Sequence, residues 1–187
     1  MIQVAILQSL TYGDYNGSIT AAELKQKGDT GIGTFDALNG EMIVIDGSIE
    51  EVPDDETIPF SNVTFFDADE TQSLEAVNDI NELKNVLNEK VLELGVNRFY
   101  MIRIDGAFSS MNVRSEYSQT EPYKPLATVL ETDQTFFDYE NLDGTVVGLY
   151  CPSYMESLNA VGWHFHFISY DRLKGVMYWT LALIQHS

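Results

Sequence analysis

Two of the three histidines in this chain, His164 and His166, lie two residues apart in the run VGWHFHFI. Side chains alternate between the two faces of a β-strand, so a strand here places both imidazoles on one face and Phe165 and Phe167 on the other. Two ligands from one rigid strand suit a zinc ion, but a zinc site needs three or four protein ligands. The spacing alone therefore favours a pair of hydrogen-bonded, half-buried histidines, with a metal site as the alternative.

Arg103 and Arg114 both lie in strand-like runs, although the chain has only 10 lysines and arginines against 29 aspartates and glutamates. An inward-facing arginine can hold a substrate carboxylate through two parallel hydrogen bonds. For either residue taken alone, an ion pair with one of the many acids is the better interpretation. Glu41 follows the Asn39-Gly40 turn at the head of the apolar run MIVI, where its carboxylate can face a pocket. Sequence alone favours a solvated turn residue at this position.

Two common kinds of functional motif are missing from the sequence. Gly31 and Gly33 begin a pattern like that of a nucleotide-binding loop, but Asp36 takes the place of the third glycine and no helical pattern follows. A serine hydrolase of the nucleophile-elbow kind needs G-x-S-x-G, which does not occur. Both classes are therefore rejected.

The composition limits the partners. A net charge of −19 over 187 residues repels nucleic acid and anionic membranes, so neither is expected as a partner, and an acidic substrate needs a local cation or metal. The single cysteine, Cys151, cannot form an internal disulfide and is expected in the core. No signal-peptide pattern begins the chain and no segment has the roughly 20 apolar residues of a membrane span, so we expect a cytoplasmic protein.

The elements that must position these residues are mostly strands. The runs on either side of Asn39-Gly40 predict a β-hairpin over 31–47. Apolar residues three and four apart predict a helix from Thr71 to Leu94, ended by Gly95. Further strands are expected at 99–106, 111–114, 145–150 and 161–168, with short helices after Thr20 and at 126–130. Many strands with few helices predict an α+β fold with mixed or antiparallel sheets.

Taken together, these runs resemble the microbial α-acetolactate decarboxylases. The matching runs lie in order from Gly28 to Ile168: GDTGIGTFDALNGEMIVIDG, NRFYMIRIDGAF, EPYKPL, DGTVVGLYCPSY and VGWHFHFI, with weaker similarity in TYGDYNGSITAAEL. The resemblance implies one decarboxylase-like unit over residues 1–187, with a subdivision into an N-terminal sheet plus helix (1–120) and an incomplete C-terminal metal-binding part (121–187). It also implies a homodimer.

The resemblance implies a site as well. It matches two zinc ligands of the family to His164 and His166, and its functional arginine, glutamate and threonine to Arg114, Glu41 and Thr34. The implied reaction is the decarboxylation of 2-acetolactate to acetoin, in which zinc stabilises the enediolate that forms as CO2 leaves. Arg114 would hold the carboxylate or the developing oxyanion, and Glu41 would act as an acid or base. Arg103 is then left with a structural role.

The resemblance fails at the C-terminal end. The family has a third zinc-binding histidine in the context G-G-H-V and later a second functional glutamate, whereas this chain reads GVMYWTL from Gly175 onward. Shifting the codons of Val176 to Leu181 by one base restores Val-Leu-Asp and allows His before it and Phe after it, which indicates a frameshift. His186 lies in an unrelated context and is not expected to be the missing ligand.

Three functions follow from the sequence. The first is the zinc lyase, with metal binding and activity weakened or lost through the altered C-terminus. The second is a truncated remnant that folds without metal and at most binds small acids. The third is an unrelated metal-dependent hydrolase with the same H-x-H pair, which the other matching runs disfavour. With a frameshift, residues 176–187 are an apolar tail without a designed partner, and one side of the zinc pocket is open.

Overall fold

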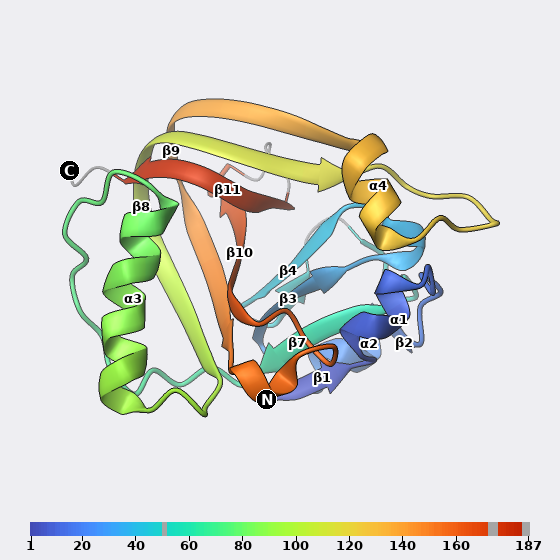
Figure 1. Cartoon of the computed structure of the whole chain (residues 1–187), viewed down its shortest axis with the longest axis horizontal. Coiled ribbons are helices and arrows are strands. Elements are labelled where there is room, and N and C mark those ends of the chain that lie inside the picture. Colours follow the sequence, from blue (N-terminus) through green and yellow to red (C-terminus); the bar gives the residue numbers. More distant parts are fainter. Residues whose placement is uncertain (50–51, 172–175, 185–187) are drawn as a thin grey trace.

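The structure is a computed structural model that describes residues 1–49, 52–171 and 176–184, the last of these through the backbone alone. Its first large element is an antiparallel sheet with the strand order β1-β7-β3-β4-β5 (Figure 1). These strands are β1 (Ile2–Val4), β3 (Thr30–Thr34), β4 (Glu41–Ile45), β5 (Ser48–Ile49) and β7 (Phe60–Thr64).

The second large element is a closed antiparallel barrel with the strand order β10-β11-β8-β9. Its strands are β8 (Tyr100–Glu116), β9 (Gln134–Cys151), β10 (Gly162–Ser169) and β11 (Val176–Ile184). A small pair, β2 (Ile19–Thr20) and β6 (Thr57–Ile58), completes the described strands. The described helices are α1 (Leu7–Thr11), α2 (Ala21–Lys25), α3 (Ile80–Leu94) and α4 (Leu126–Thr132), with 3-10 turns at Asp36–Leu38 and Ser153–Met155. The predicted α+β class with antiparallel sheets is therefore confirmed.

The predicted hairpin is formed by β3 and β4, whose register pairs Thr34 with Glu41. The connection between them is longer than the Asn39-Gly40 turn, because it includes a 3-10 turn at Asp36–Leu38. Gly40 closes the connection with a φ of 86°, a left-handed conformation in which a side chain would be strained. Glu41 therefore enters β4 directly after a tight, fixed bend.

Helix α3 begins at Ile80, so the prediction that it begins at Thr71 is wrong. Asp79 caps the helix, since its carboxylate accepts the backbone N–H groups of Asn81 at 2.7 Å and Glu82 at 2.9 Å. The apolar spacing misled because Val77 enters the same core as the helix, although its own backbone is not helical. The predicted end at Gly95 is confirmed, with a φ of 115° at that glycine.

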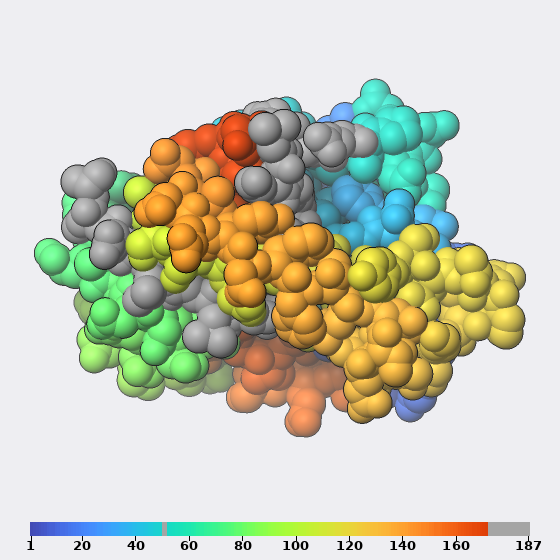
Figure 2. Space-filling model, turned by 90° about the horizontal axis from the view of Figure 1, so that it is seen from above, coloured from blue at the N-terminus to red at the C-terminus, as the bar shows by residue number. Residues whose placement is uncertain are grey.

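The two strands predicted at 99–106 and 111–114 are one continuous strand, β8. It pairs with β9 from Tyr100 opposite Tyr150 to Glu116 opposite Gln134. The serines between the predicted strands do not break the strand, because the ladder of β9 satisfies the backbone on both sides of them. Figure 1 shows these two long strands running side by side toward α4, and in Figure 2 the orange residues of β9 lie between the green residues of α3 and the yellow segment around α4.

Residues 176–187 were predicted to be a tail without a designed partner. The described part of this tail, strand β11, contradicts that prediction, because its backbone pairs with a strand on each side. It pairs with β10 through His166 opposite Tyr178 and with β8 through Arg114 opposite Tyr178. Backbone pairing requires extended conformation and free ladder groups, and it does not require particular side chains. The tail therefore closes the barrel in this structure.

Two apolar layers hold the sheet, the barrel and α3 together. Between α3 and the barrel lie residues such as Leu83, Phe165 and Phe167, while Ile32 and Ile43 of the sheet pack against β9 and β10 on the other face. Strand β10 is therefore covered by apolar residues on one face and by the sheet on the other. Among the described residues, no helix has both the length and the hydropathy needed to cross a membrane.

Candidate active site

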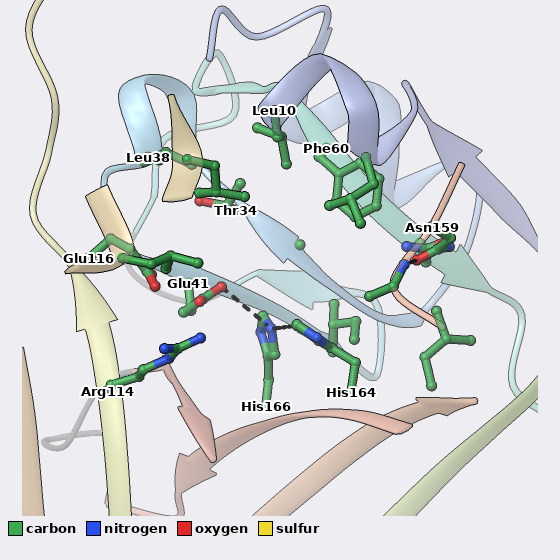
Figure 3. A pocket seen from close by; sticks show the side chains of 18 residues that line it. Leu10, Thr34, Leu38, Glu41, Phe60, Arg114, Glu116, Asn159, His164 and His166 are labelled. Atoms are coloured by element: carbon green, nitrogen blue, oxygen red, sulfur yellow. Dashed lines mark hydrogen bonds and ion pairs between the residues drawn. The ribbon is translucent and has the colours of Figure 1, made fainter. Parts of the chain in front are cut away.

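A pocket of about 120 Å³ opens between the sheet and the barrel. All five residues that the sequence predicted for the site line it: Thr34, Glu41, Arg114, His164 and His166. In Figure 3 Arg114 and the two histidines point from the barrel strands toward Glu41, and Leu10, Leu38 and Phe60 face them across the cavity. The fold thus gathers residues that are far apart in the sequence.

The alternation of β10 divides its residues as predicted. His164 and His166 line the pocket, whereas Phe165 and Phe167 lie in the core beneath α3. Glu41 and Thr34 come from the facing ends of β4 and β3, and Arg114 comes from the end of β8 nearest the pocket. Each functional side chain is therefore carried by a strand with a fixed register.

His166 is held in one tautomer by the backbone. Its Nδ1 lies 2.9 Å from the carbonyl oxygen of Met42, and because a carbonyl can only accept, the Nδ1 must carry the proton. The Nε2 of His166 is then unprotonated and lies 3.0 Å from the Nε2 of His164. This is the arrangement in which a carbonyl orients a metal-binding histidine, with the free nitrogen turned into the site.

Both histidines are neutral at pH 7. Burial, and then the charge of Arg114, lowers the pKa of His164 to about 4. Burial, and then the neighbouring His164, lowers the pKa of His166 well below its usual value. Neutral imidazole is the form that binds metal ions. The contact of 3.4 Å between His166 Nε2 and Glu41 Oε2 is for the same reason not an ion pair.

Only 12% of the Glu41 side chain is exposed, so the interpretation of a solvated turn residue is wrong. Its pKa is raised well above the usual value by burial, then by the charge of Glu116 and by a hydrogen bond with it, while Arg114 acts in the opposite direction. The cause is the bend at Gly40, which turns the first residue of β4 inward. A raised pKa favours the protonated form of the group, and a protonated carboxyl group can serve as an acid.

The other predicted residues divide into pocket and surface. Nη1 of Arg114 donates to Oε1 of Gln134 at 3.2 Å, which ties the arginine to the start of β9. The Thr34 hydroxyl donates to the carbonyl of Gly40 at 2.8 Å, so it braces the bend before Glu41. Arg103 does not line this pocket. It pairs instead with Asp46 at 2.8 Å and Asp105 at 2.9 Å, which confirms the predicted ion-pair role.

Sequence reasoning missed two polar parts of the pocket wall. Glu116 lies on the same face of β8 as Arg114, and the period of two along the strand is the signal that would have found it. Asn159 donates to Asn62 Oδ1 and to Gln3 Oε1, both at 2.9 Å, and so joins the loop before β10 to β7 and β1. No local pattern marks that buried amide network, because it depends on contacts between distant segments.

The histidine pair fits part of a zinc site. Two neutral imidazoles present Nε2 atoms 3.0 Å apart, a separation at which both can contact one ion at about 2.0 to 2.1 Å. The described residues contain no group of three or more His, Cys, Asp or Glu side chains arranged for a metal ion. The predicted position of the missing third histidine, and His186, fall outside the residues whose side chains are described.

Comparison with known proteins identifies the relatives of this chain. The family model for alpha-acetolactate decarboxylase matches residues 1–177. Alpha-acetolactate decarboxylase of Methanosarcina mazei is 38% identical over 184 residues, covering 94% of this chain and 63% of that protein. The protein of the same name from Brevibacillus brevis is 34% identical over 184 residues, covering 94% of this chain and 64% of its own length.

A solved structure agrees with this similarity. The crystal structure of alpha-acetolactate decarboxylase from Bacillus subtilis strain 168 superposes with a TM-score of 0.91 at 32% sequence identity, covering 98% of this chain and 80% of that one. The chain spans 63% and 64% of the length of the Methanosarcina and Brevibacillus relatives, which is less than two thirds of either protein.

Proposed function

Because the chain belongs to the α-acetolactate decarboxylase family, we propose that it removes CO2 from 2-acetolactate (2-hydroxy-2-methyl-3-oxobutanoate) and forms acetoin in the pocket between the sheet and the barrel. The observation that carries the proposal is the gathering of Glu41, Arg114, His164 and His166 around one small cavity. A 2-hydroxy-3-keto acid presents a carboxylate, a hydroxyl and a ketone to these groups.

The reaction sets two tasks for the protein. The bond between the carboxylate carbon and the carbinol carbon breaks, and its electron pair stays on the carbinol carbon and delocalises onto the neighbouring ketone oxygen. A proton must then reach carbon. A zinc ion held by His164 and His166 would supply a Lewis acid for the ketone and hydroxyl oxygens. The remaining tasks of binding, water exclusion and proton delivery belong to the side chains.

Arg114 is placed to bind the substrate carboxylate. A guanidinium offers paired donors to a carboxylate, and Gln134 fixes its orientation through Nη1. Six apolar side chains form much of the remaining wall: Leu7, Leu10, Leu38, Phe60, Leu126 and Leu130. This wall excludes water from the charged carboxylate and suits the neutral CO2 that leaves.

Glu41 is placed to deliver the proton. Its carboxyl lies 3.4 Å from His166 Nε2, beside the proposed position of the reacting oxygens, and burial raises its pKa well above the usual value, which favours the protonated form. In the same position it can return to the protonated state by exchange with solvent after product leaves. Glu41 therefore acts as the acid of the reaction.

A second candidate is a small-acid-binding protein without catalysis. It is favoured by the described residues, which supply two histidines and no third ligand. The match to the family model ends at residue 177, within the segment that the frameshift hypothesis marks as altered. Reading the coding DNA from Lys174 to Leu181 tests that hypothesis directly, and a frame-corrected chain with G-G-H-V after Lys174 is expected to bind zinc more tightly.

Metal analysis and product formation separate the two candidates. For the decarboxylase we expect one zinc per chain, lost in His164→Ala, and acetoin from racemic acetolactate, lost in Arg114→Ala and Glu41→Gln. Arg103→Gln is the matched arginine control, since Arg103 lies outside the pocket and should leave activity unchanged. A folded, metal-free protein that forms no acetoin would support the binding protein instead. The homodimer, the cytoplasmic location and the subdivision at residue 120 stay predictions.

A further inference from the structure

Asn62 is a buried polar residue of the pocket wall, and the chemistry proposed above does not use it. It is the middle residue of β7, it is 1% exposed, and it lies between Gln3 of β1 and Ile32 of β3 in the sheet. Phe60 and Asn62 line the pocket, whereas Val63 packs in a separate apolar core. The alternation of β7 therefore directs the Asn62 side chain to the pocket face of the sheet.

Backbone groups fix the orientation of two neighbouring amide side chains. Nε2 of Gln3 donates to the carbonyls of Ala5 at 2.9 Å and Leu158 at 2.7 Å, so Oε1 of Gln3 is left as an acceptor. The backbone N–H of Ala160 donates to Oδ1 of Asn159 at 2.7 Å, so Nδ2 of Asn159 is left as a donor. Neither amide can be reversed without losing these bonds.

These two amides determine which end of the Asn62 side chain remains available. Nδ2 of Asn159 donates to Oε1 of Gln3 and to Oδ1 of Asn62, both at 2.9 Å. The oxygen of Asn62 is therefore engaged, and among the described residues no hydrogen bond uses its Nδ2 group. A buried donor without a partner is unfavourable, so this nitrogen suits a ligand that brings an oxygen into the pocket.

The position of Asn62 indicates which oxygen that is. Figure 3 places Arg114 and Asn159 on opposite sides of the two histidines, and Asn62 lies beside Asn159 through their hydrogen bond. When the substrate carboxylate is bound by Arg114, the end of the molecule that carries the ketone lies toward Asn62. The ketone oxygen can accept a hydrogen bond and has no proton to donate.

We propose that Nδ2 of Asn62 donates a hydrogen bond to the ketone oxygen of the 2-hydroxy-3-keto acid, an inference that rests on the proposed decarboxylation. Negative charge develops on this oxygen as CO2 leaves, so a fixed donor stabilises the transition state more than the bound substrate. The strand and the two oriented amides hold the donor in place before the substrate enters. The same bond makes the pocket selective for acids with an oxygen at that carbon.

The main test compares two stable acids that do not lose CO2. One is 2,3-dihydroxy-2-methylbutanoate, which has an oxygen at the position of the ketone, and the other is 2-hydroxy-2-methylbutanoate, which has none there. Calorimetry gives the ratio of their dissociation constants for the unaltered chain and for Asn62→Leu. We expect the unaltered chain to prefer the dihydroxy acid, and Asn62→Leu to reduce this preference by about 2- to 10-fold.

Asn159→Leu is the matched control, because it breaks the same bond between the two asparagines and leaves Nδ2 of Asn62 present. This variant should keep most of the preference. Steady-state kinetics with acetolactate should show a loss in kcat of about 100- to 1000-fold for Asn62→Leu, as for the removal of other donors to a developing oxyanion. A crystal structure of the unaltered chain with the dihydroxy acid should show Nδ2 within hydrogen-bond distance of the added oxygen, and it needs no variant to fold.

Three results would overturn the inference: an unaltered chain that does not prefer the dihydroxy acid, a bound acid whose added oxygen lies away from Nδ2, and equal losses of preference in Asn62→Leu and Asn159→Leu. The last result would mean that the amide network, and not the donor, shapes the pocket. Failure of the proposed function looks different, because the unaltered chain would then form no acetoin. The binding ratio and the crystal structure still decide the role of Asn62 in that event.

Discussion

Replacing Asp79 by alanine should destabilise the protein, because Asp79 caps α3 from outside the helix. Its carboxylate accepts two backbone N–H groups, from Asn81 and Glu82, that have no partner within the helix. Loss of such a cap costs about 1 kcal/mol and up to about 2 kcal/mol. For a chain of this size each kcal/mol lowers the Tm by about 2 to 4 °C. We expect a fall of that order for Asp79→Ala, and a much smaller one for Asp79→Asn.

The sign of this effect distinguishes the two helix boundaries. If the helix began at Thr71, as the apolar spacing predicted, Asp79 would be an interior residue, and alanine would stabilise the helix by several tenths of a kcal/mol. Urea and thermal unfolding can be followed by the fluorescence of Trp163, whose Nε1 donates to Asn88 of α3 at 3.1 Å. Asp67→Ala, exposed before the helix, is the matched control. An unchanged or raised Tm in Asp79→Ala would refute the capping argument.

Three further predictions concern titration, packing and the bend. The pKa of His164 in the folded, metal-free protein is about 4, below the usual 6.5, so the unfolded chain binds more protons than the folded chain between these pH values. The contribution of His164 to stability is therefore fully present above pH 6.5 and is lost as the pH drops toward 4. This loss should be weaker in His164→Gln when urea midpoints are compared in the presence of a chelator. Burial raises the pKa of the Cys151 thiol to about 11, so a thiol reagent at pH 8 should modify the native protein far more slowly than the urea-unfolded chain, and equal rates would contradict the burial. Thr34→Val removes the hydroxyl that braces Gly40 and should cost about 1 kcal/mol in urea unfolding, whereas Thr34→Ser keeps the hydroxyl and should cost less; equal losses would mean that the hydroxyl stabilises the fold no more than the methyl group does.

Period-two reasoning was enough to place the core of the site. His164 and His166 face the pocket and Phe165 and Phe167 face α3, which follows from the geometry of any strand. The same rule applied to β8 would have joined Glu116 to Arg114, since they are two residues apart. The family resemblance assigns no role to Glu116, and only the folded structure brings it into the same pocket as Glu41.

Long-range contacts account for what sequence could not give. The low exposure of the Glu41 side chain depends on the bend at Gly40 and on β8, which is distant in the sequence. The polar residues next to Glu41 in the sequence therefore wrongly predicted that it is solvated. The start of α3 was predicted wrongly because Val77 packs in the same apolar core as the helix although it is not part of the helix. The continuity of β8 is likewise set by its partner β9, which no pattern within residues 99–116 can express.

The length of β8 has a consequence for which insertions and deletions the gene can tolerate. The strand is 17 residues long. Residues of β8 pack in the same core as α3, and its C-terminal end presents Arg114 and Glu116 to the pocket. Because its side chains alternate, loss or gain of one residue along it would exchange the two faces beyond that point and turn both side chains out of the cavity. Related sequences should therefore vary in length before Tyr100 and after Glu116, and hold a constant spacing between them.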